Sequence, residues 1–221
     1  MTRQLIFDLS ARQALTRADF FVSPSNALAL RTVEGWADWP ARKLMLLGPE
    51  GAGKTHLAHI WATETGASIL SARDLADMDL GTLPSRPVVV EDVDRIGPAE
   101  VALLHLHNLI TARSALLLTA AVPPRDWGLT LPDLISRMQA TAIAQLDPPD
   151  DALLSAVLIK LFADRQIAVP VNLIPYLVSR MPRSIGGARG LVTALDARAL
   201  ALGRPITRPL AAEVLDSADR Q

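Results

Sequence analysis

Gly48-Pro49-Glu50-Gly51-Ala52-Gly53-Lys54-Thr55 is the stretch of sequence that decides the fold of this chain. These eight residues match the phosphate-binding loop pattern G-x-x-x-x-G-K-[ST]. The apolar residues 43–47 before the loop predict a short buried strand, and residues 56–62 after it predict an amphipathic helix. Because a phosphate loop connects a strand to a helix, this setting favours a real motif over a chance glycine-rich turn. The pattern therefore predicts binding of a nucleoside di- or triphosphate.

Each part of this loop has a physical role in holding phosphate. The glycines allow backbone N–H groups to turn inward as an anion-binding nest, and the following helix directs its positive end at the phosphates. We expect Lys54 to neutralise the β- and γ-phosphates. We expect the hydroxyl of Thr55 to ligate Mg²⁺.

The composition is that of a compact globular protein. The chain has 221 residues, of which 50% are hydrophobic and only 20% are charged, so it can bury an ample core. It contains no cysteine, which excludes disulfides and thiolate metal sites. The formal net charge of -1 favours neither DNA nor membrane binding. The first four residues lead into no signal-type segment and the apolar runs are short, so we expect a cytoplasmic protein.

Strands and helices alternate through the first two thirds of the chain. Apolar runs at 43–47, 68–70, 87–90, 115–119 and 142–146 predict five short buried strands. A helix is predicted at 100–112, with Val101, Leu104, Leu109 and Ile110 on overlapping faces. Because strands that alternate with helices form parallel sheets, we expect a mostly parallel sheet covered on both sides. The fold class is therefore α/β.

The pattern changes after residues 147–150. From there the periodicity is only helical, with helices predicted at 151–166, 172–180, 187–202 and 210–218 and prolines between them. The simplest organisation is an N-terminal segment at 1–17, an α/β nucleotide-binding core at 18–147 and a small all-helical subdomain at 148–221.

Two carboxylates follow the third predicted strand. Glu91 and Asp92 come directly after three valines, and Val93 and Asp94 follow them. Open α/β sheets bind ligands at the carboxyl ends of their strands. There Glu91 and Asp92 can hold Mg²⁺, with Thr55, and Asp92 can polarise an attacking water. A solvated turn after a strand is the alternative interpretation.

These motifs, in this order, resemble the AAA+ ATPases, and most of all the ATPase region of DnaA replication initiators. The resemblance is carried by the loop, by 91–92, by 117–119, by 136–137, by 187–189 and by Asp19-Phe20-Phe21-Val22-Ser23-Pro24-Ser25-Asn26. It implies an AAA+ core with a five-stranded parallel sheet and a helical lid, binding ADP or ATP with Mg²⁺. The implied nucleotide contacts are Phe21, Val22, Pro49, Gly51, Ala52, Gly53, Lys54, Thr55, His56 and Arg189.

The resemblance also assigns roles to two arginines. Arg137, in a segment similar to the family's arginine-finger segment, would act on a nucleotide bound to a neighbouring subunit. Arg189 would reach from the helical lid back to the phosphates. Without the family, Arg137 is an ordinary helix-surface arginine, and Arg189 forms a salt bridge with Asp196 or another nearby acid.

A DnaA-like ATPase whose sequence ends at Gln221, before a basic helix-turn-helix domain, resembles the Hda-type regulatory inactivators of DnaA. The resemblance implies DnaA and the DNA-loaded β sliding clamp as partners, without direct sequence-specific DNA binding or membrane association, and allows a homo-oligomer. Gln4, Leu5, Phe7 and Leu9 are similar to a clamp-docking peptide, in which hydrophobic residues enter a groove and glutamine binds its rim. A first strand or a packed arm is the alternative.

Two departures from the family pattern bear on hydrolysis. Glu91 replaces the first of two aspartates, and its longer arm shifts the geometry of an ion that requires near-ideal octahedral placement. Ala121 stands where a polar residue that senses the γ-phosphate is expected. We therefore expect nucleotide binding with slow or absent intrinsic ATP turnover.

Other interpretations remain open at this level. A helicase loader or another DNA-bound AAA+ ATPase would need a basic surface, and a P-loop small-molecule kinase would need an acceptor pocket. The histidines are interpreted as structural, with His56 near the phosphates as the exception. Trp36, Trp39 and Trp61 are expected in the core.

Overall fold

The structure is a computed structural model that describes residues 15–80, 86–110 and 114–218. Its centre is a five-stranded sheet in the order β2-β3-β4-β1-β5, and every neighbouring pair is parallel. The predicted α/β class and the five strands are confirmed, with ends that differ by at most one residue from those expected. The strands are β1 Lys43–Leu47, β2 Ser68–Ser71, β3 Val88–Glu91, β4 Leu116–Ala120 and β5 Ala142–Gln145.

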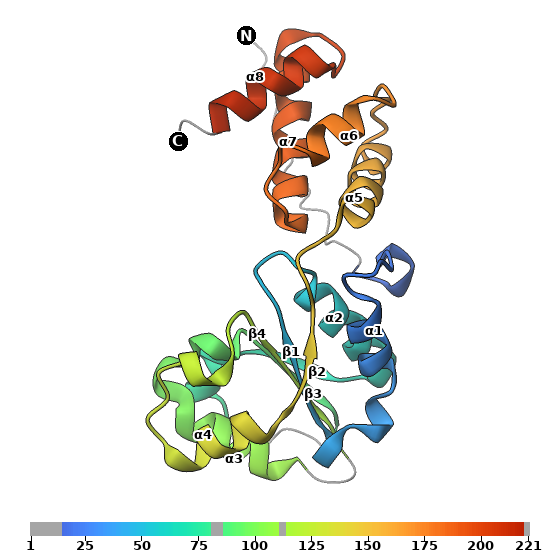
Figure 1. The fold of residues 1–221 in the computed structure, drawn as a ribbon. Helices are drawn as coiled ribbons and strands as arrows, with labels where there is room; N and C mark the ends of the chain where they lie inside the picture. The colour runs from blue at the N-terminus through green and yellow to red at the C-terminus, as the bar shows by residue number, and fades with distance from the viewer. Residues whose placement is uncertain (1–14, 81–85, 111–113, 219–221) are drawn as a thin grey trace, which may run out of the picture.

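Helices cover both faces of this sheet. Helices α1 (Ala27–Glu34) and α2 (Lys54–Thr65) lie on one face, and α3 (Glu100–Leu109) and α4 (Pro132–Ala140) lie on the other (Figure 1). Successive strand residues point to opposite cores: Leu44 and Leu46 join the first core, and Met45 joins the second. Because both faces are buried, the strands are continuous apolar runs instead of alternating ones.

Tryptophans anchor the core on the α1 and α2 side. Trp39 stacks on the fully buried Trp61 with ring centroids 5.2 Å apart, and its indole N–H donates to the carbonyl of Thr32. Trp36 meets Trp61 edge-on at 6.3 Å and is only partly buried against this core. The expected core positions of Trp39 and Trp61 are confirmed, and Trp36 lies at the margin.

A separate helical region follows the sheet, with a core of its own (Figure 1). Its first helix begins after Asp150, whose carboxylate accepts a hydrogen bond from the Leu153 N–H at 2.8 Å. Its longest helix begins after Ser184, whose hydroxyl accepts from the Gly187 N–H at 2.9 Å. The predicted helices of this region are confirmed as α5 Asp151–Asp164, α6 Leu173–Val178, α7 Ile185–Leu202 and α8 Arg208–Ala218.

The apolar residues expected on overlapping faces of α3 do not all pack against the sheet: Leu104 and Ile110 are partly buried there. Val101 and Leu109 are 68% and 44% exposed, whereas Leu103, Leu106 and His107 are buried against the sheet and α4. The helix is apolar on almost every side, so its hydrophobic periodicity does not select one face. The helix predicted at 100–112 is also too long, because α3 already ends at Leu109.

His107 is a buried histidine beside two cations. Burial, and then the charges of Lys43 and Arg137, lower the pKa of its imidazole to about 4. Its Nδ1 has no hydrogen-bond partner within the described ranges. The side chain is therefore neutral in the folded protein at neutral pH.

This pKa predicts an acid sensitivity. Between pH 6.5 and about 4 the unfolded chain binds a proton at His107 that the folded protein does not, so the free energy of unfolding falls as pH falls. The shift corresponds to about 3 kcal/mol. His107→Leu should therefore lose less stability than the parent protein between pH 7 and pH 4.5, measured by urea unfolding. Equal losses in both proteins would show that His107 is not the group responsible.

In the part of the chain that the structure describes, no helix combines the length and apolar character needed to cross a membrane.

Candidate functional site

The glycine-rich loop joins β1 to α2 at the carboxyl edge of the sheet. Gly51 and Gly53 have φ values of +75° and +104°, a region that side chains with a Cβ rarely adopt. A Cβ on Gly51 would lie 2.4 Å from the Cβ of Ser184, and the Ile185 N–H donates to the Gly51 carbonyl at 3.0 Å. The loop is therefore shaped by glycine and held directly against the start of α7.

Lys54 is buried beneath the loop. Its ammonium donates to the carbonyls of Gly48 at 2.7 Å and Pro49 at 3.0 Å. Burial lowers its pKa, and the carboxylates of Asp94 and Asp92 act in the opposite direction. A cation desolvated in this way is stabilised further by an anion, so the loop is suited to hold one.

Carboxylates surround the end of β3. Asp92 has a left-handed backbone (φ 56°), and its N–H donates to the hydroxyl of Thr119 on β4 at 3.0 Å. Glu91 lies 3.8 Å from the ring Nε2 of His59, and its Oε1 is buried with no partner among the described residues. Glu91 thus faces α2, and Asp92 faces the cavity beside the loop.

Asp94 was not assigned a role from the sequence. Its Oδ2 accepts a hydrogen bond from the Ala121 N–H at 3.2 Å, and its buried Oδ1 has no partner in the described part of the chain. Of the acids that act on Lys54, Asp94 has the largest effect on its pKa. The spacing of two residues from Asp92 was the available signal, but only the turn after β3 brings Asp94 against β4.

Two connected cavities open at the loop. One, the loop cavity, has a volume of about 420 Å³ and is lined by Gly51, Gly53, Lys54, Thr55 and Asp92, among others. The other, the helix cavity, has about 440 Å³ and extends between the segment before α1 and helices α5 and α7. They share four lining residues, which are Leu15, His56, Ile185 and Arg189.

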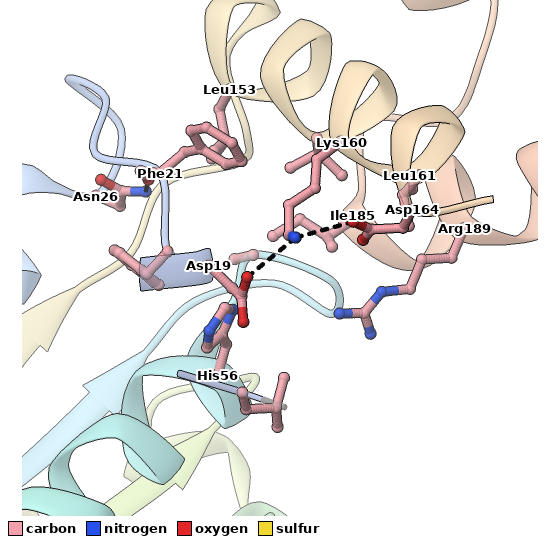
Figure 2. A pocket seen from close by; sticks show the side chains of 14 residues that line it. Asp19, Phe21, Asn26, His56, Leu153, Lys160, Leu161, Asp164, Ile185 and Arg189 are labelled. Carbon is pink, nitrogen blue, oxygen red and sulfur yellow. Dashed lines mark hydrogen bonds and ion pairs between the residues drawn. The ribbon is translucent and has the colours of Figure 1, made fainter. Parts of the chain in front are cut away.

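An ion pair crosses the helix cavity (Figure 2). Lys160 on α5 lies 3.0 Å from Asp19 and 3.2 Å from Asp164 on its own helix. A hydrogen bond from Thr16 and the contact with Lys160 lower the pKa of Asp19. These contacts connect the segment before α1 to the helical region on one wall of the cavity. Sequence reasoning did not predict the contact between Asp19 and Lys160, because the two residues are far apart in the chain.

The segment before α1 is shaped by Asn26. Its side-chain amide donates to the Phe21 carbonyl at 2.8 Å and accepts from the Ser23 N–H at 2.9 Å. This holds Phe21 in the wall of the helix cavity, whereas Val22 is 53% exposed and does not line it. Of these two candidate contacts, the structure therefore brings only Phe21 to the cavity.

Two basic side chains lie where the cavities meet. His56 donates through Nε2 to the Thr16 carbonyl at 3.0 Å, and burial lowers its pKa. Arg189 comes from α7 and points toward the loop (Figure 2). Its expected alternative partner, Asp196, pairs instead with Arg165 at 3.9 Å. Burial lowers the pKa of Arg189, which is half-buried with no ion pair to a described carboxylate.

The remaining candidate nucleotide contacts lie in the loop itself. Ala52 lines the helix cavity, and Thr55 lines the loop cavity. Pro49 contributes the carbonyl that accepts from Lys54. The structure therefore gathers the loop, Asp92, Phe21, His56 and Arg189 around one connected space.

Arg137 lines neither of the two cavities. It is exposed on α4, close to Lys43, whose pKa is lowered by burial and then by the Arg137 guanidinium. Lys43 begins β1, and the loop follows the other end of that strand. The structure thus separates Arg137 from this chain's own loop by the length of β1. The proposed clamp-docking residues Gln4, Leu5, Phe7 and Leu9 lie outside the described residues.

The strand order, the loop after β1 and the carboxylates after β3 define an AAA+ P-loop NTPase fold with a helical C-terminal region. No protein-family model matches the sequence. Solved structures match closely in fold. Domain III of the Thermotoga maritima replication initiation protein DnaA aligns with a TM-score of 0.76 at 19% identity, over 92% of this chain and 96% of that chain.

Two larger proteins show the same fold. AMPPCP-bound DnaA from Aquifex aeolicus aligns with a TM-score of 0.67 at 16% identity, over 82% of this chain and 65% of that chain. The Thermotoga maritima Holliday junction branch migration motor RuvB aligns with a TM-score of 0.62 at 17% identity, over 87% of this chain and 66% of that chain. This chain thus spans about two thirds of the length of these two proteins. The likeness establishes a DnaA-like AAA+ fold.

Proposed function

We propose that this protein is an adenine-nucleotide-binding regulator of replication initiation of the Hda type. It binds ADP or ATP and the DNA-loaded β sliding clamp, and promotes hydrolysis of the ATP bound to DnaA. Residues 18–147 form the nucleotide-binding core, and residues 148–221 form the lid. Residues 1–17 carry the clamp-binding segment.

The two connected cavities support nucleotide binding. The phosphates lie in the loop cavity, which is lined by loop residues, Lys54 and Arg189. The base and ribose extend into the helix cavity beside Phe21. A solved DnaA structure holds the ATP analogue AMPPCP on the same fold.

The donor set fits a Mg²⁺ ion. Glu91 and Asp94 each carry a buried carboxylate oxygen without a partner in the described part of the chain, and such an atom is costly unless something binds it. The described residues contain no group of three or more His, Cys, Asp and Glu side chains suited to a metal. A Mg²⁺ ion at a nucleotide uses one or two carboxylates, the substrate phosphates and water. Of the three expected ligands, Thr55 and Asp92 line the loop cavity and would hold the ion, whereas Glu91 faces α2 and does not line that cavity. The ion would neutralise charge on the phosphates.

We infer that intrinsic ATP turnover is slow. Thr119 is buried, its hydroxyl oxygen accepts from the Asp92 N–H, and it does not line the loop cavity. Ala121 offers only its N–H, which already donates to Asp94. No side chain of β4 thus replaces the missing polar residue that would contact the γ-phosphate. Binding of nucleotide without efficient turnover suits a conformational partner.

The position of Arg137 is the observation that carries the regulatory proposal. It is exposed and lies at the amino end of β1, away from this chain's own phosphates. An arginine finger in this place acts on a nucleotide held by another molecule. We therefore assign Arg137 to the ATP bound by DnaA.

The test follows labelled ATP with the protein alone, with DnaA, and with DnaA plus clamp loaded on DNA. We expect conversion of DnaA-bound ATP to ADP to be fastest when all three are present. Gln4→Ala with Leu5→Ala should abolish clamp binding, since these side chains dock the segment, and should leave nucleotide affinity unchanged.

Two results would contradict this function. Rapid turnover without DnaA, lost on Asp92→Asn, would indicate a motor ATPase such as a helicase loader. Clamp binding that survives the Gln4 and Leu5 substitutions would assign the segment to a packed arm of the domain.

A further inference from the structure

An ion pair at the rim of the loop cavity has no role in the nucleotide site as described so far. Arg95 Nη2 contacts Glu50 Oε1. Glu50 belongs to the phosphate loop, and Arg95 ends the short 3-10 helix η6 (Val93–Arg95) after β3. The pair therefore joins the two segments that carry the loop and the carboxylates.

The pair is exposed and easily exchanged. The Arg95 and Glu50 side chains are 47% and 75% exposed, and exposed ion pairs contribute only about 0–1 kcal/mol. By contrast, the backbone of Arg95 is held by its N–H, which donates to the Asp92 carbonyl at 2.9 Å. The guanidinium can thus move to a stronger anion while its backbone stays in place.

Arg95 faces the same space as the phosphate-binding groups. It lines the loop cavity together with Lys54, Thr55 and Asp92. Its positive charge also lowers the pKa of Lys54, although burial and the nearby carboxylates have larger effects. A phosphate in this cavity would meet the Arg95 guanidinium without any change of secondary structure.

Glu50 opposes phosphate binding in the loop cavity, whereas Arg95 favours it. A carboxylate on the loop repels phosphate, and pairing with Arg95 neutralises it. When Arg95 turns to phosphate, Glu50 is left in water, where 75% of its side chain is already exposed. The exchange therefore needs little desolvation of either partner.

We propose that Arg95 leaves Glu50 to bind the terminal phosphate of a nucleoside triphosphate, and so distinguishes ATP from ADP. This inference rests on the proposed function, because it assigns a contact within the same nucleotide site. The planar guanidinium suits two phosphate oxygens at once. It supplies the cationic contact to the γ-phosphate that the side chain of Ala121 cannot make. With ADP the partner phosphate is missing, and Arg95 remains on Glu50.

The test compares a non-hydrolysable ATP analogue with ADP by titration calorimetry. Arg95→Gln should weaken analogue binding about tenfold or more, as expected for a hydrogen-bonded charged contact, and should change ADP binding by less than about threefold. Glu50→Gln should tighten analogue binding by up to about fivefold, since it removes the competing pair. The control Arg198→Gln removes a similarly exposed pair, with Glu213 at 3.7 Å on α7 and α8, and should change neither affinity.

The double variant separates this role from simple neutralisation of Glu50. Arg95→Gln in the Glu50→Gln background should still lose analogue affinity about tenfold relative to Glu50→Gln alone. If the double variant instead regains full affinity, or if Arg95→Gln weakens both nucleotides equally, Arg95 only neutralises Glu50 and the proposal is wrong. A parent protein that binds neither nucleotide would overturn the proposed function itself. Thermal unfolding without nucleotide establishes that each variant is folded.

Discussion

Lys54→Ala is expected to abolish binding of ATP and ADP, with a loss of about 100-fold or more. The ammonium of Lys54 is buried and donates to the Gly48 and Pro49 carbonyls, directly beneath the space proposed for the phosphates. Its replacement removes a charged donor and leaves the Asp92 and Asp94 carboxylates uncompensated beside that space. Titration calorimetry with each nucleotide measures the effect.

The control for this variant is its unfolding free energy without nucleotide. Lys54→Ala also deletes two hydrogen bonds within the loop, so a modest stability change of about 1–3 kcal/mol is expected. Urea unfolding distinguishes a folded, binding-deficient protein from an unfolded one. A folded variant with undiminished nucleotide affinity would contradict the assignment of the loop.

Arg137→Ala is expected to keep clamp and nucleotide binding and to lose stimulation of ATP hydrolysis on DnaA. An arginine finger contributes about 10³–10⁵ in rate, so the loss should approach the rate of DnaA alone. The fold should tolerate the change because Arg137 is exposed, while Leu134 and Met138 provide the buried face of α4. The measurement is conversion of DnaA-bound ATP to ADP with DNA-loaded clamp.

Arg137→Lys is expected to be almost as defective, because an ammonium lacks the planar fork of the guanidinium. Arg125→Ala offers a matched control: it is a second exposed arginine on the connection between β4 and α4, and should stimulate normally. Full stimulation by Arg137→Ala would place the catalytic group on DnaA itself.

The sheet and the helices were predictable because local sequence dominates there. The five apolar runs end within a residue of the observed strands, since a strand buried on both faces requires uninterrupted apolar side chains. The loop could be identified because its left-handed backbone at 51 and 53 requires glycine there, which leaves a mark in the sequence. The exception is α3, whose apolar surface extends on almost every side and conceals which residues face the sheet.

The site was predictable only where a contiguous motif carries it. Asp94 could not be assigned, because its role depends on the Ala121 N–H, which follows the end of β4. The Asp19 contact with Lys160 joins residues 141 positions apart, and no local pattern records it. Arg95 and Glu50 are likewise distant in sequence and meet only because β3 and β1 end at the same edge of the sheet.

The sequence by itself therefore determined the strand–loop–helix unit, the α/β order and the helical C-terminal region, since each depends on neighbouring residues and their periodicity. Only the tertiary structure decided how these parts share one space. Parallel strands bring their carboxyl ends together, and the start of α7 packs against Gly51, so that Arg189 approaches the loop. It also separated Arg137 from that space, because α4 runs back to the amino edge of the sheet before β5 begins. Proximity between segments distant in the chain is a property of packing, and packing depends on the whole fold.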